Sequence, residues 1–295
     1  MQKLPDAHGG PVALPPYRVV AFNIAAQLEN KIHDHDVAHR YGFSGGLVPG
    51  TAVFGYMVHQ AVALWGRDWL EKGSAQCHFS HPVYDGSLAL VTAQHAHDQM
   101  DIEVNSNDLV CATGHAAIDS CEQAPDLALY RFSQPPLPQN RPVADMKSLA
   151  PGSVLCTNPY ALTREQSLAW LAELRETDPV YTRENLMHPA SLLRLCNWTL
   201  MHNLALGPWI HTASHIRNFQ SMPVGASLDA RAIVLKNWEH KGHLMVELDV
   251  LVLIDGNTPA ARITHTAIYL PRQVRANSAV NSQSLPSVLT CTNLT

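Results

Sequence analysis

The sequence predicts an α+β protein made of two copies of one unit, in which a long apolar helix precedes an antiparallel sheet. Three observations support this prediction. The same order of landmarks occurs twice, each copy has an apolar segment long enough for a buried helix, and a proline-rich linker separates the copies. The length of 295 residues is sufficient for two domains of ordinary size.

The first copy has its predicted helix over residues 50–65, which are almost all apolar. Pro49 precedes this helix and Gly50 opens it, which is typical of a helix start. Phe79 and the Pro-Val pair at residues 82–83 then lead into the sheet. The predicted strands of this copy are rich in apolar residues and cover residues 17–25, 87–93 and 109–118.

The second copy repeats this order. Its predicted helix covers residues 190–202, after Pro189, and a phenylalanine again precedes a Pro-Val pair, at residues 223–224. The segments 114–118 and 264–268 both read His-x-Ala-Ile at their ends, which favours a repeat over two unrelated domains. The predicted strands of this copy cover residues 152–158, 227–235, 243–254 and 260–270.

A helix that is apolar on all sides must be covered on all sides, and a strongly curved sheet provides that cover. This arrangement is the hotdog, so the two fused copies predict a double hotdog. An extra amphipathic helix is expected over residues 162–174, with Thr163 as its N-cap. The expected boundaries are residues 1–133 for the first unit, 134–148 for the linker, 149–274 for the second unit and 275–295 for a flexible tail.

Composition argues against several classes of function. The formal net charge is -5 and no basic cluster is present, so we expect no nucleic-acid partner. No apolar run reaches the ~20 residues of a membrane span, and we expect a cytoplasmic protein without a membrane partner. No P-loop or dinucleotide fingerprint occurs, so no cofactor is expected. The segment from His33 to Asp36 lacks a third ligand at suitable spacing and the cysteines form no C-x-x-C pair, so no metal site is expected.

The segment between residues 30 and 50 is the most informative part of the chain. It contains an Asn-x-Ile-His sequence, then an alanine, a glycine-rich turn and a glycine that opens the first long helix. In this order of residues the chain resembles the MaoC-like, or (R)-specific, enoyl-thioester hydratases. The residues that carry the resemblance are Asn30, Ile32, His33, Ala38, Gly42, Phe43 and Gly50.

The resemblance implies a lyase that hydrates or dehydrates an acyl thioester of coenzyme A or acyl carrier protein. Such a reaction needs a base for water, an acid for the α-carbon and donors for the enolate oxygen. His33 is the expected catalytic residue, because an imidazole can accept and return a proton near neutral pH. Asn30, Gly50 and Thr51 are expected to bind the substrate, the last two through free N–H groups at the helix start.

The chain departs from the family motif at three positions. Leu28 stands where the family has its catalytic aspartate, Lys31 replaces the proline of the motif, and Pro49 replaces the histidine of the His-Gly pair. Because leucine cannot take a proton, the usual Asp/His pair is not intact.

A nearby carboxylate is expected to replace the missing acid. We favour Asp34 as the second catalytic residue, because it directly follows the Ile-His pair, and keep Glu29 and Asp36 as alternatives. An aspartate near a helix start also commonly serves as a cap.

Other functions on the same scaffold stay open: a thioesterase, a reassigned enzyme that cyclises or eliminates, and a non-catalytic ligand-binding protein. The expected partner is a small-molecule acyl thioester or related metabolite, bound by a monomer or a homodimer. The second copy has no Asn-x-Ile-His segment, so we expect it to be a scaffold. His188, His115 and His265 are accordingly expected to be structural.

Overall fold

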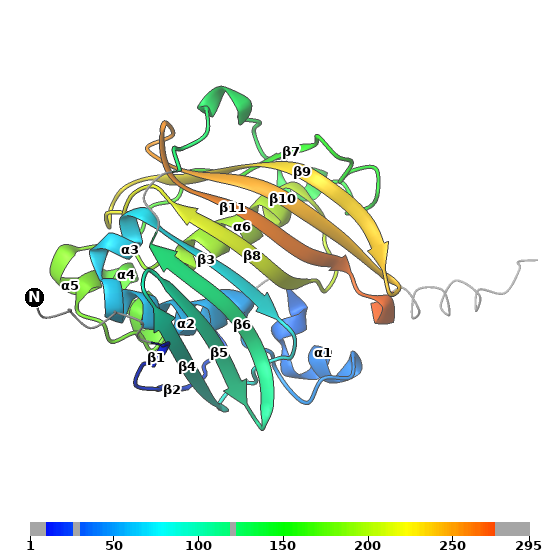
Figure 1. Cartoon of the computed structure of the whole chain (residues 1–295). Helices are drawn as coiled ribbons and strands as arrows, with labels where there is room; N and C mark the ends of the chain where they lie inside the picture. Colours follow the sequence, from blue (N-terminus) through cyan, green and yellow to red (C-terminus); the bar gives the residue numbers. More distant parts are fainter. Residues whose placement is uncertain (1–9, 26–29, 119–121, 275–295) are drawn as a thin grey trace, which may run out of the picture.

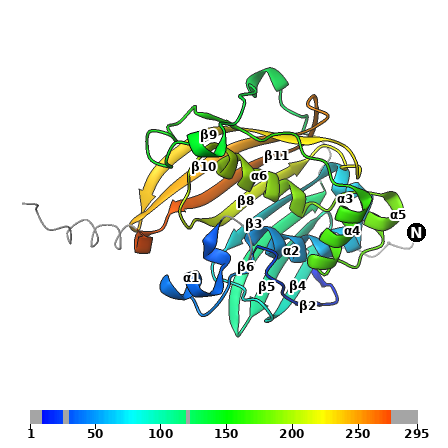
Figure 2. The ribbon, with the colours of Figure 1, turned by 180° about the vertical axis from the view of Figure 1, so that it is seen from behind.

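The computed structural model describes residues 10–25, 30–118 and 122–274. Leu28, Glu29 and the predicted tail lie outside these ranges. Within them, one antiparallel sheet of 11 strands curves around two long helices, α2 (Gly50–Trp65) and α6 (Ala190–Asn203) (Figure 1). The two helices contact each other on the concave face of the sheet, as the view from behind shows (Figure 2). The α+β fold class is therefore confirmed.

The order of the strands shows two copies joined edge to edge. The first copy contributes β1-β4-β5-β6-β3 and the second β8-β11-β10-β9-β7, with β2 beside β4. Because β3 pairs with β8, the halves share one continuous sheet, and each buries an edge that would otherwise be exposed. The strands are β1 (Val12–Ala13), β2 (Tyr17–Val20), β3 (Gly73–Phe79), β4 (Leu88–Ala96), β5 (Gln99–Ser106), β6 (Leu109–Ile118), β7 (Val154–Cys156), β8 (Ile210–Asn218), β9 (Leu228–His240), β10 (His243–Ile254) and β11 (Thr258–Leu270).

The long helix α2 is buried as its composition predicts. Phe54, Tyr56 and Met57 are all nearly inaccessible to solvent. Neighbouring helix positions point about 100° apart, so burial of consecutive residues requires cover on several sides. Strands β2 to β6 cover one side and α6 covers another. Truncating one of the large buried side chains to alanine would cost about 3–5 kcal/mol.

Short helices complete the chain. The predicted extra helix is α4, and Thr163 caps it in a capping box with Gln166. Helices α1, α3 and α5 were not predicted, because five or six residues are too few for an apolar period to be recognised. The short helices are η1 (Lys31–His33), α1 (His35–Arg40), α3 (Arg67–Lys72), η2 (Leu127–Leu129), η3 (Pro138–Asn140), α4 (Arg164–Glu173) and α5 (Val180–Glu184).

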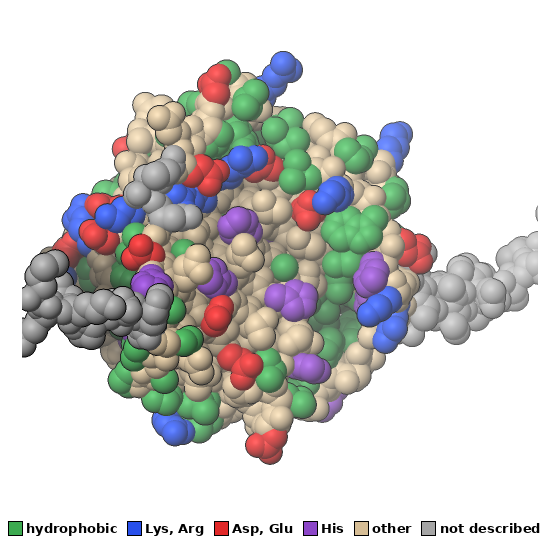
Figure 3. Space-filling view, viewed as in Figure 1, with side chains coloured by type: hydrophobic (Ala, Val, Ile, Leu, Met, Phe, Trp, Pro, Cys, Tyr) green, Lys and Arg blue, Asp and Glu red, His purple; other side chains and the backbone are tan. Residues whose placement is uncertain are grey.

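The outer, convex face of the sheet is polar. Histidine side chains gather on it over the central strands (Figure 3). They include His78 on β3, His115 on β6 and His215 on β8, and His115 lies 3.0 Å from Asp101. No three or more His, Cys, Asp or Glu side chains of the described ranges lie together at positions suited to a metal ion. In the same ranges, no helix is long and apolar enough to cross a membrane.

A β-bulge in β8 changes which side chains of that strand face inward. Thr212 is an extra residue between His211 and Ala213, which pair with consecutive residues of β11. In a regular strand, side chains two positions apart share a face. The bulge instead places His211 and Ser214, three positions apart, on the same buried face. It thereby directs His211 toward the interior, next to the start of α2.

Candidate active site at the start of helix α2

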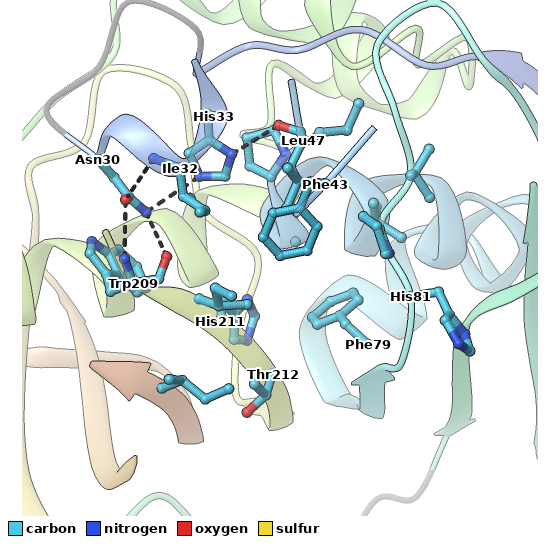
Figure 4. Close-up of a pocket in the computed structure, with 18 of the residues that line it drawn as sticks. Asn30, Ile32, His33, Phe43, Leu47, Phe79, His81, Trp209, His211 and Thr212 are labelled. Carbon is cyan, nitrogen blue, oxygen red and sulfur yellow. Dashed lines mark hydrogen bonds between the residues drawn. The ribbon is translucent and has the colours of Figure 1, made fainter. Parts of the chain in front are cut away.

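A cavity of about 220 Å³ lies at the start of α2 and is walled by both halves of the chain (Figure 4). Its lining is mainly apolar, with a few convergent polar groups, which is typical of a small-molecule site. The polar groups come from the segment around η1, the start of α2, Ser80 and His81 after β3, α6 and β8. The apolar lining residues are Ile32, Phe43, Leu47, Val48, Pro49, Val53, Phe79, Pro82, Val83, Ile210 and Ile268.

His33, the predicted catalytic residue, lies in this cavity wall. Its Nδ1–H donates to the backbone oxygen of Leu47 at 2.9 Å, which leaves Nε2 as the unprotonated nitrogen. The amide Nδ2 of Asn30 lies 3.5 Å from that Nε2. Burial lowers the pKa of His33 to about 4, so the imidazole is neutral at pH 7. Its Nε2 lone pair can therefore accept a proton.

Asn30 joins the two halves of the site. Its Nδ2 donates to the backbone oxygen of Trp209 at 2.9 Å, and its Oδ1 accepts the backbone N–H of Trp209 at 3.3 Å. The same oxygen caps η1 by accepting the N–H of Ile32. Asn30 thus lines the predicted site, but its main contacts fix the positions of η1 and β8 relative to one another.

The first turn of α2 supplies free donors. The first N–H groups with acceptors are those of Ala52 and Val53, both bonded to the oxygen of Pro49. In the described ranges, the N–H groups of Gly50 and Thr51 have no acceptor, as expected at the start of a helix. Gly50 lines the cavity, and a Cβ there would lie 2.9 Å from Nδ1 of His211. Glycine is therefore required for the close approach of the two groups.

His211 is the site residue that the sequence did not reveal. It comes from β8 of the other half and is 7% exposed, and its Nδ1 has no hydrogen-bond partner. Its Nε2 lies 3.2 Å from the backbone oxygen of Ala213 and 2.8 Å from Oγ of Ser214. Since a carbonyl oxygen can only accept, the proton resides on Nε2, and Nδ1 presents a lone pair beside Gly50.

Ser214 connects His211 to a second buried imidazole. Its Oγ lies 3.0 Å from Nδ1 of His265, and the two imidazole rings are 4.2 Å apart. Burial lowers the pKa of His211 to about 3. Burial, and then the proximity of His211, holds the pKa of His265 well below its ordinary value. The network therefore keeps His211 neutral and fixes its orientation.

Of the predicted carboxylates, neither Asp34 nor Asp36 lines the cavity. The side chain of Asp34 accepts the N–H of Val37 at 3.0 Å and caps α1, and Asp36 is exposed in the first turn of that helix. Glu29 lies outside the described residues. Thr51 is buried beside a second, adjoining cavity. His33 and Gly50 line the cavity and Asp34 does not, and the catalytic or binding roles of all three stay predictions.

Comparisons with known proteins bear on the fold. No protein-family model matches the chain, and no curated protein matches it in sequence. Among solved structures, it is similar to a conserved hypothetical protein from Mycobacterium tuberculosis with a double hotdog fold. That match has 12% identity and a TM-score of 0.63, and it covers 88% of this chain and 96% of the other. This chain has the double hotdog fold.

Other double-length structures carry the same arrangement with different functions in their names. A MaoC domain protein described as a dehydratase, from Chloroflexus aurantiacus, is 10% identical with a TM-score of 0.56, covering 89% of this chain and 95% of that one. A protein described as an oleoyl thioesterase, from Lactobacillus plantarum, is 12% identical with a TM-score of 0.51, covering 88% and 96%. At such identities the comparison establishes the fold alone, and the predicted resemblance to MaoC-like proteins is confirmed at that level.

At the matching place in the second hotdog unit, the described residues enclose a much smaller space. Beside Pro189, at the start of α6, the space is only about 10 Å³. His188, which directly precedes Pro189, is itself buried: its Nδ1 accepts the N–H of Ala190 at 3.1 Å, and its Nε2 lies 3.4 Å from Oε2 of Glu176. Glu176 is also 2.7 Å from Nδ1 of His59 on α2. His188 is thus tied to both helices, in line with the expected structural role.

Proposed function

We propose that this double hotdog protein is an acyl-thioester hydro-lyase that adds water to an enoyl thioester, or removes it from a hydroxyacyl thioester. One observation carries the proposal. Two neutral imidazoles, His33 and His211, line the same apolar cavity beside the free N–H groups of α2; Nε2 of His33 has only Asn30 within hydrogen-bond distance, at 3.5 Å, and the buried Nδ1 of His211 has no partner. Together they supply a base for water and donors for a developing oxyanion.

In the hydration direction, a water molecule donates hydrogen bonds to Nε2 of His33 and Nδ1 of His211. Its oxygen adds to the β-carbon while His33 takes one proton, and the electrons of the double bond move to the thioester oxygen. The N–H groups of Gly50 and Thr51 stabilise that enolate oxygen. The imidazolium of His33 then returns the proton to the α-carbon, so that atoms and charge balance. Dehydration is the reverse.

This mechanism assigns to His211 the part that a carboxylate plays in the family motif. Leucine at position 28 cannot hold water, and neither Asp34 nor Asp36 lines the cavity. An imidazole lone pair is a hydrogen-bond acceptor like a carboxylate oxygen, but it is neutral and can remain buried. A water held between two acceptors needs no negative charge in the cavity.

A thioesterase is the second candidate, because the same arrangement can direct water at a thioester carbonyl. The two reactions differ in their products. Incubation with crotonyl-CoA should give 3-hydroxybutyryl-CoA without free thiol if the proposal holds. Release of free coenzyme A would establish hydrolysis instead, and no turnover of this or longer enoyl thioesters would contradict both.

The role of His211 has its own test. His211→Ala should lower turnover by roughly 10²-fold or more, within the range for general acid–base groups. His215→Ala is the matched control, since His215 lies on the same strand but on the outer face and should leave turnover unchanged. Thermal melting of both variants checks folding. Equal activity of the two variants would remove His211 from the mechanism.

The pH dependence of kcat/KM tests the protonation states. Both imidazoles must be unprotonated in the free enzyme, and burial lowers the pKa of His33 to about 4 and that of His211 to about 3. Activity should therefore persist down to about pH 5 and fall as the pH drops through 4. A histidine with the ordinary pKa of ~6.5 would retain only about 3% of its activity at pH 5. An acid limb centred near 6.5 would contradict the assignment.

A further inference from the structure

We propose that the second cavity, adjoining the first, binds a carboxylate of the substrate, so that the substrate is a carboxyacyl thioester. This inference rests on the proposed function. The second cavity has a volume of about 230 Å³ and also touches Thr51 at the start of α2. The two cavities share the wall residues Asn30, His33, Pro49, Asn197 and Trp209.

A positively charged side chain is held in place in the second cavity. Arg194, on α6, has its guanidinium carbon 4.7 Å from the ring centre of Trp198, 4.8 Å from that of Trp170 and 5.5 Å from that of Tyr160. Such stacking orients the planar guanidinium and leaves its N–H edges free. No carboxylate of residues 10–25, 30–118 or 122–274 lies within ion-pair distance of Arg194, in contrast to Arg231 and Arg262, which have carboxylate partners.

Further donors without acceptors line the same cavity. Nε1 of Trp170 and Nε1 of Trp209 are both buried without a hydrogen-bond partner, and these side chains are only 7% and 3% exposed. A buried N–H that lacks an acceptor is unfavourable, so two of them beside a free guanidinium indicate a ligand rich in acceptors.

The charge of the lining favours a carboxylate over a phosphate. Among the described residues that line this cavity, Arg194 is the one cation, and Glu173, exposed at the cavity, is the one anion. His33 adds no charge, because burial keeps it neutral. A single guanidinium matches a monoanionic carboxylate in a bidentate pair, with indole N–H groups as additional donors. A phosphate dianion would need more positive charge than this wall contains.

The two adjoining cavities also determine where the carboxylate of the substrate would lie relative to the reacting carbons. The proposed acid–base groups lie on or beside the shared wall, and the apolar residues lie in the first cavity. A ligand that reacts at His33 can therefore extend its charged end toward Arg194 without entering the apolar lining. Burying a carboxylate in the first cavity would be unfavourable, since the described residues that line it include no lysine or arginine to pair with it.

Binding of two saturated thioesters with acyl chains of equal carbon number tests the inference. Hexanoyl-CoA and adipoyl-CoA differ only in the terminal carboxylate and cannot be hydrated. Calorimetric titration of the wild type should give adipoyl-CoA a Kd about 10- to 100-fold lower, as expected for charged hydrogen bonds in a desolvated site. Quenching of fluorescence from the cavity tryptophans should report the same difference.

Variants assign the difference to the second cavity. Arg194→Gln should abolish the preference for adipoyl-CoA and leave hexanoyl-CoA binding unchanged, while Arg194→Lys should restore part of it. Arg175→Gln is the matched control, because Arg175 also stacks on a ring, that of Phe22, but lines neither cavity. It should keep the full preference. Circular dichroism and thermal melting check that each variant is folded.

The outcomes separate this inference from the proposed function. Equal binding of both thioesters by the wild type, binding of neither, or equal weakening of both by Arg194→Gln in a folded protein would overturn the carboxylate site. A preference for adipoyl-CoA that depends on Arg194 supports it, even if hexenoyl and hexenedioyl thioesters are not hydrated. In that last case the carboxylate site is supported and the proposed hydro-lyase activity is contradicted.

Discussion

The starts of α2 and α6 occupy matching places in the two hotdog units, yet their N–H groups are used differently. At α6, His188 accepts the N–H of Ala190 and is buried against Glu176. At α2, valine stands in the place of His188, glycine in the place of alanine, and the first N–H groups have no acceptor in the described ranges. The cavity at the start of α2 has a volume of about 220 Å³, whereas the space beside Pro189 at the start of α6 measures about 10 Å³.

The contrast shows how a duplicated unit can divide stability and chemistry between its copies. Unpaired donors and a cavity both reduce the stability of a fold. Here the second unit satisfies its helix start internally and joins the two helices through Glu176, which lies 2.7 Å from His59. Hydrogen bonds from His188 and His59 overcome the effect of burial and lower the pKa of Glu176 below its ordinary value. The first unit leaves its helix start open to a ligand.

The largest expected effect is on turnover, from a substitution in the first unit, whose helix start borders the cavity. His33→Ala should lower turnover by roughly 10²–10⁴-fold, because it removes the base. Thermal stability should change little, since His33 lines a cavity instead of filling the core. Steady-state kinetics with the active thioester, paired with melting curves, measure both. Full activity of the variant would mean that the chemistry lies elsewhere and that the two units are not divided as described.

His188→Ala tests the start of α6 in the second unit, and its effect should be on the stability of the fold. The variant removes an acceptor from Ala190 and leaves Glu176 with fewer partners in a buried position. We expect a loss of about 2–4 kcal/mol in the free energy of unfolding, measured by urea denaturation, with turnover per folded molecule retained. His115→Ala, on the outer face, serves as control. A loss of turnover that exceeds the loss of folded protein would give the second unit a catalytic part.

Gly50→Ala gives the start of α2 the residue that α6 has at the matching position, Ala190. The added Cβ would lie 2.9 Å from Nδ1 of His211 and 3.1 Å from the ring of Phe79, so His211 must move. Turnover should fall about tenfold, because a small displacement of an acid–base group slows the reaction. The higher helix propensity of alanine should stabilise the fold by up to ~1 kcal/mol. The reverse exchange, Ala190→Gly, should lower stability by about 0.5–1 kcal/mol and spare turnover. If Gly50→Ala leaves kinetics unchanged, the close approach to His211 has no role.

The smallest expected effect concerns the favoured carboxylate of the sequence analysis. Asp34→Asn keeps a side-chain oxygen for the N–H of Val37, and asparagine caps helices about as well as aspartate. If Asp34 is only a cap, turnover should therefore stay within about threefold of the wild type, and the melting temperature within about one degree. Asp36→Asn provides the comparison on the same helix. A loss equal to that of His33→Ala would instead make Asp34 the missing acid.

The large elements could be predicted because their signals are local. The helix at residues 50–65 has the bounds that its apolar run and Pro49 indicate, and the second helix begins after Pro189 as expected. Strand β5 was missed, although Met100, Ile102 and Val104 alternate with polar residues, because Asp101 and Glu103 break up any apolar run. His33, which lines the cavity, was singled out through its neighbours in the chain, whose order resembles a known motif.

The rest of the site could not be predicted, because it depends on contacts between distant segments. His211 reaches the cavity only after β8 pairs with β3 and β11, and nothing near it in the sequence indicates a catalytic role. Arg194 lies on the second long helix, where the aromatic residues that hold it read as ordinary core. Asp34 was favoured for its position next to His33, but the chain turns into α1 there and directs its carboxylate to Val37.

The bulge at Thr212 has a genetic consequence. A residue inserted into a regular strand would exchange the faces of every position on one side of it, but a bulge accommodates the extra residue and keeps the pairing on both sides. Because His211 pairs with Ala267 and Ala213 with Thr266, the strand accepts the additional codon for Thr212 without turning His211 outward. In a chain whose gene carries the unit twice, such an insertion affects one copy and leaves the other intact. Deleting the codon for Thr212 should accordingly give a regular strand, in which His211 lies two positions before Ser214 and keeps its place on the inner face.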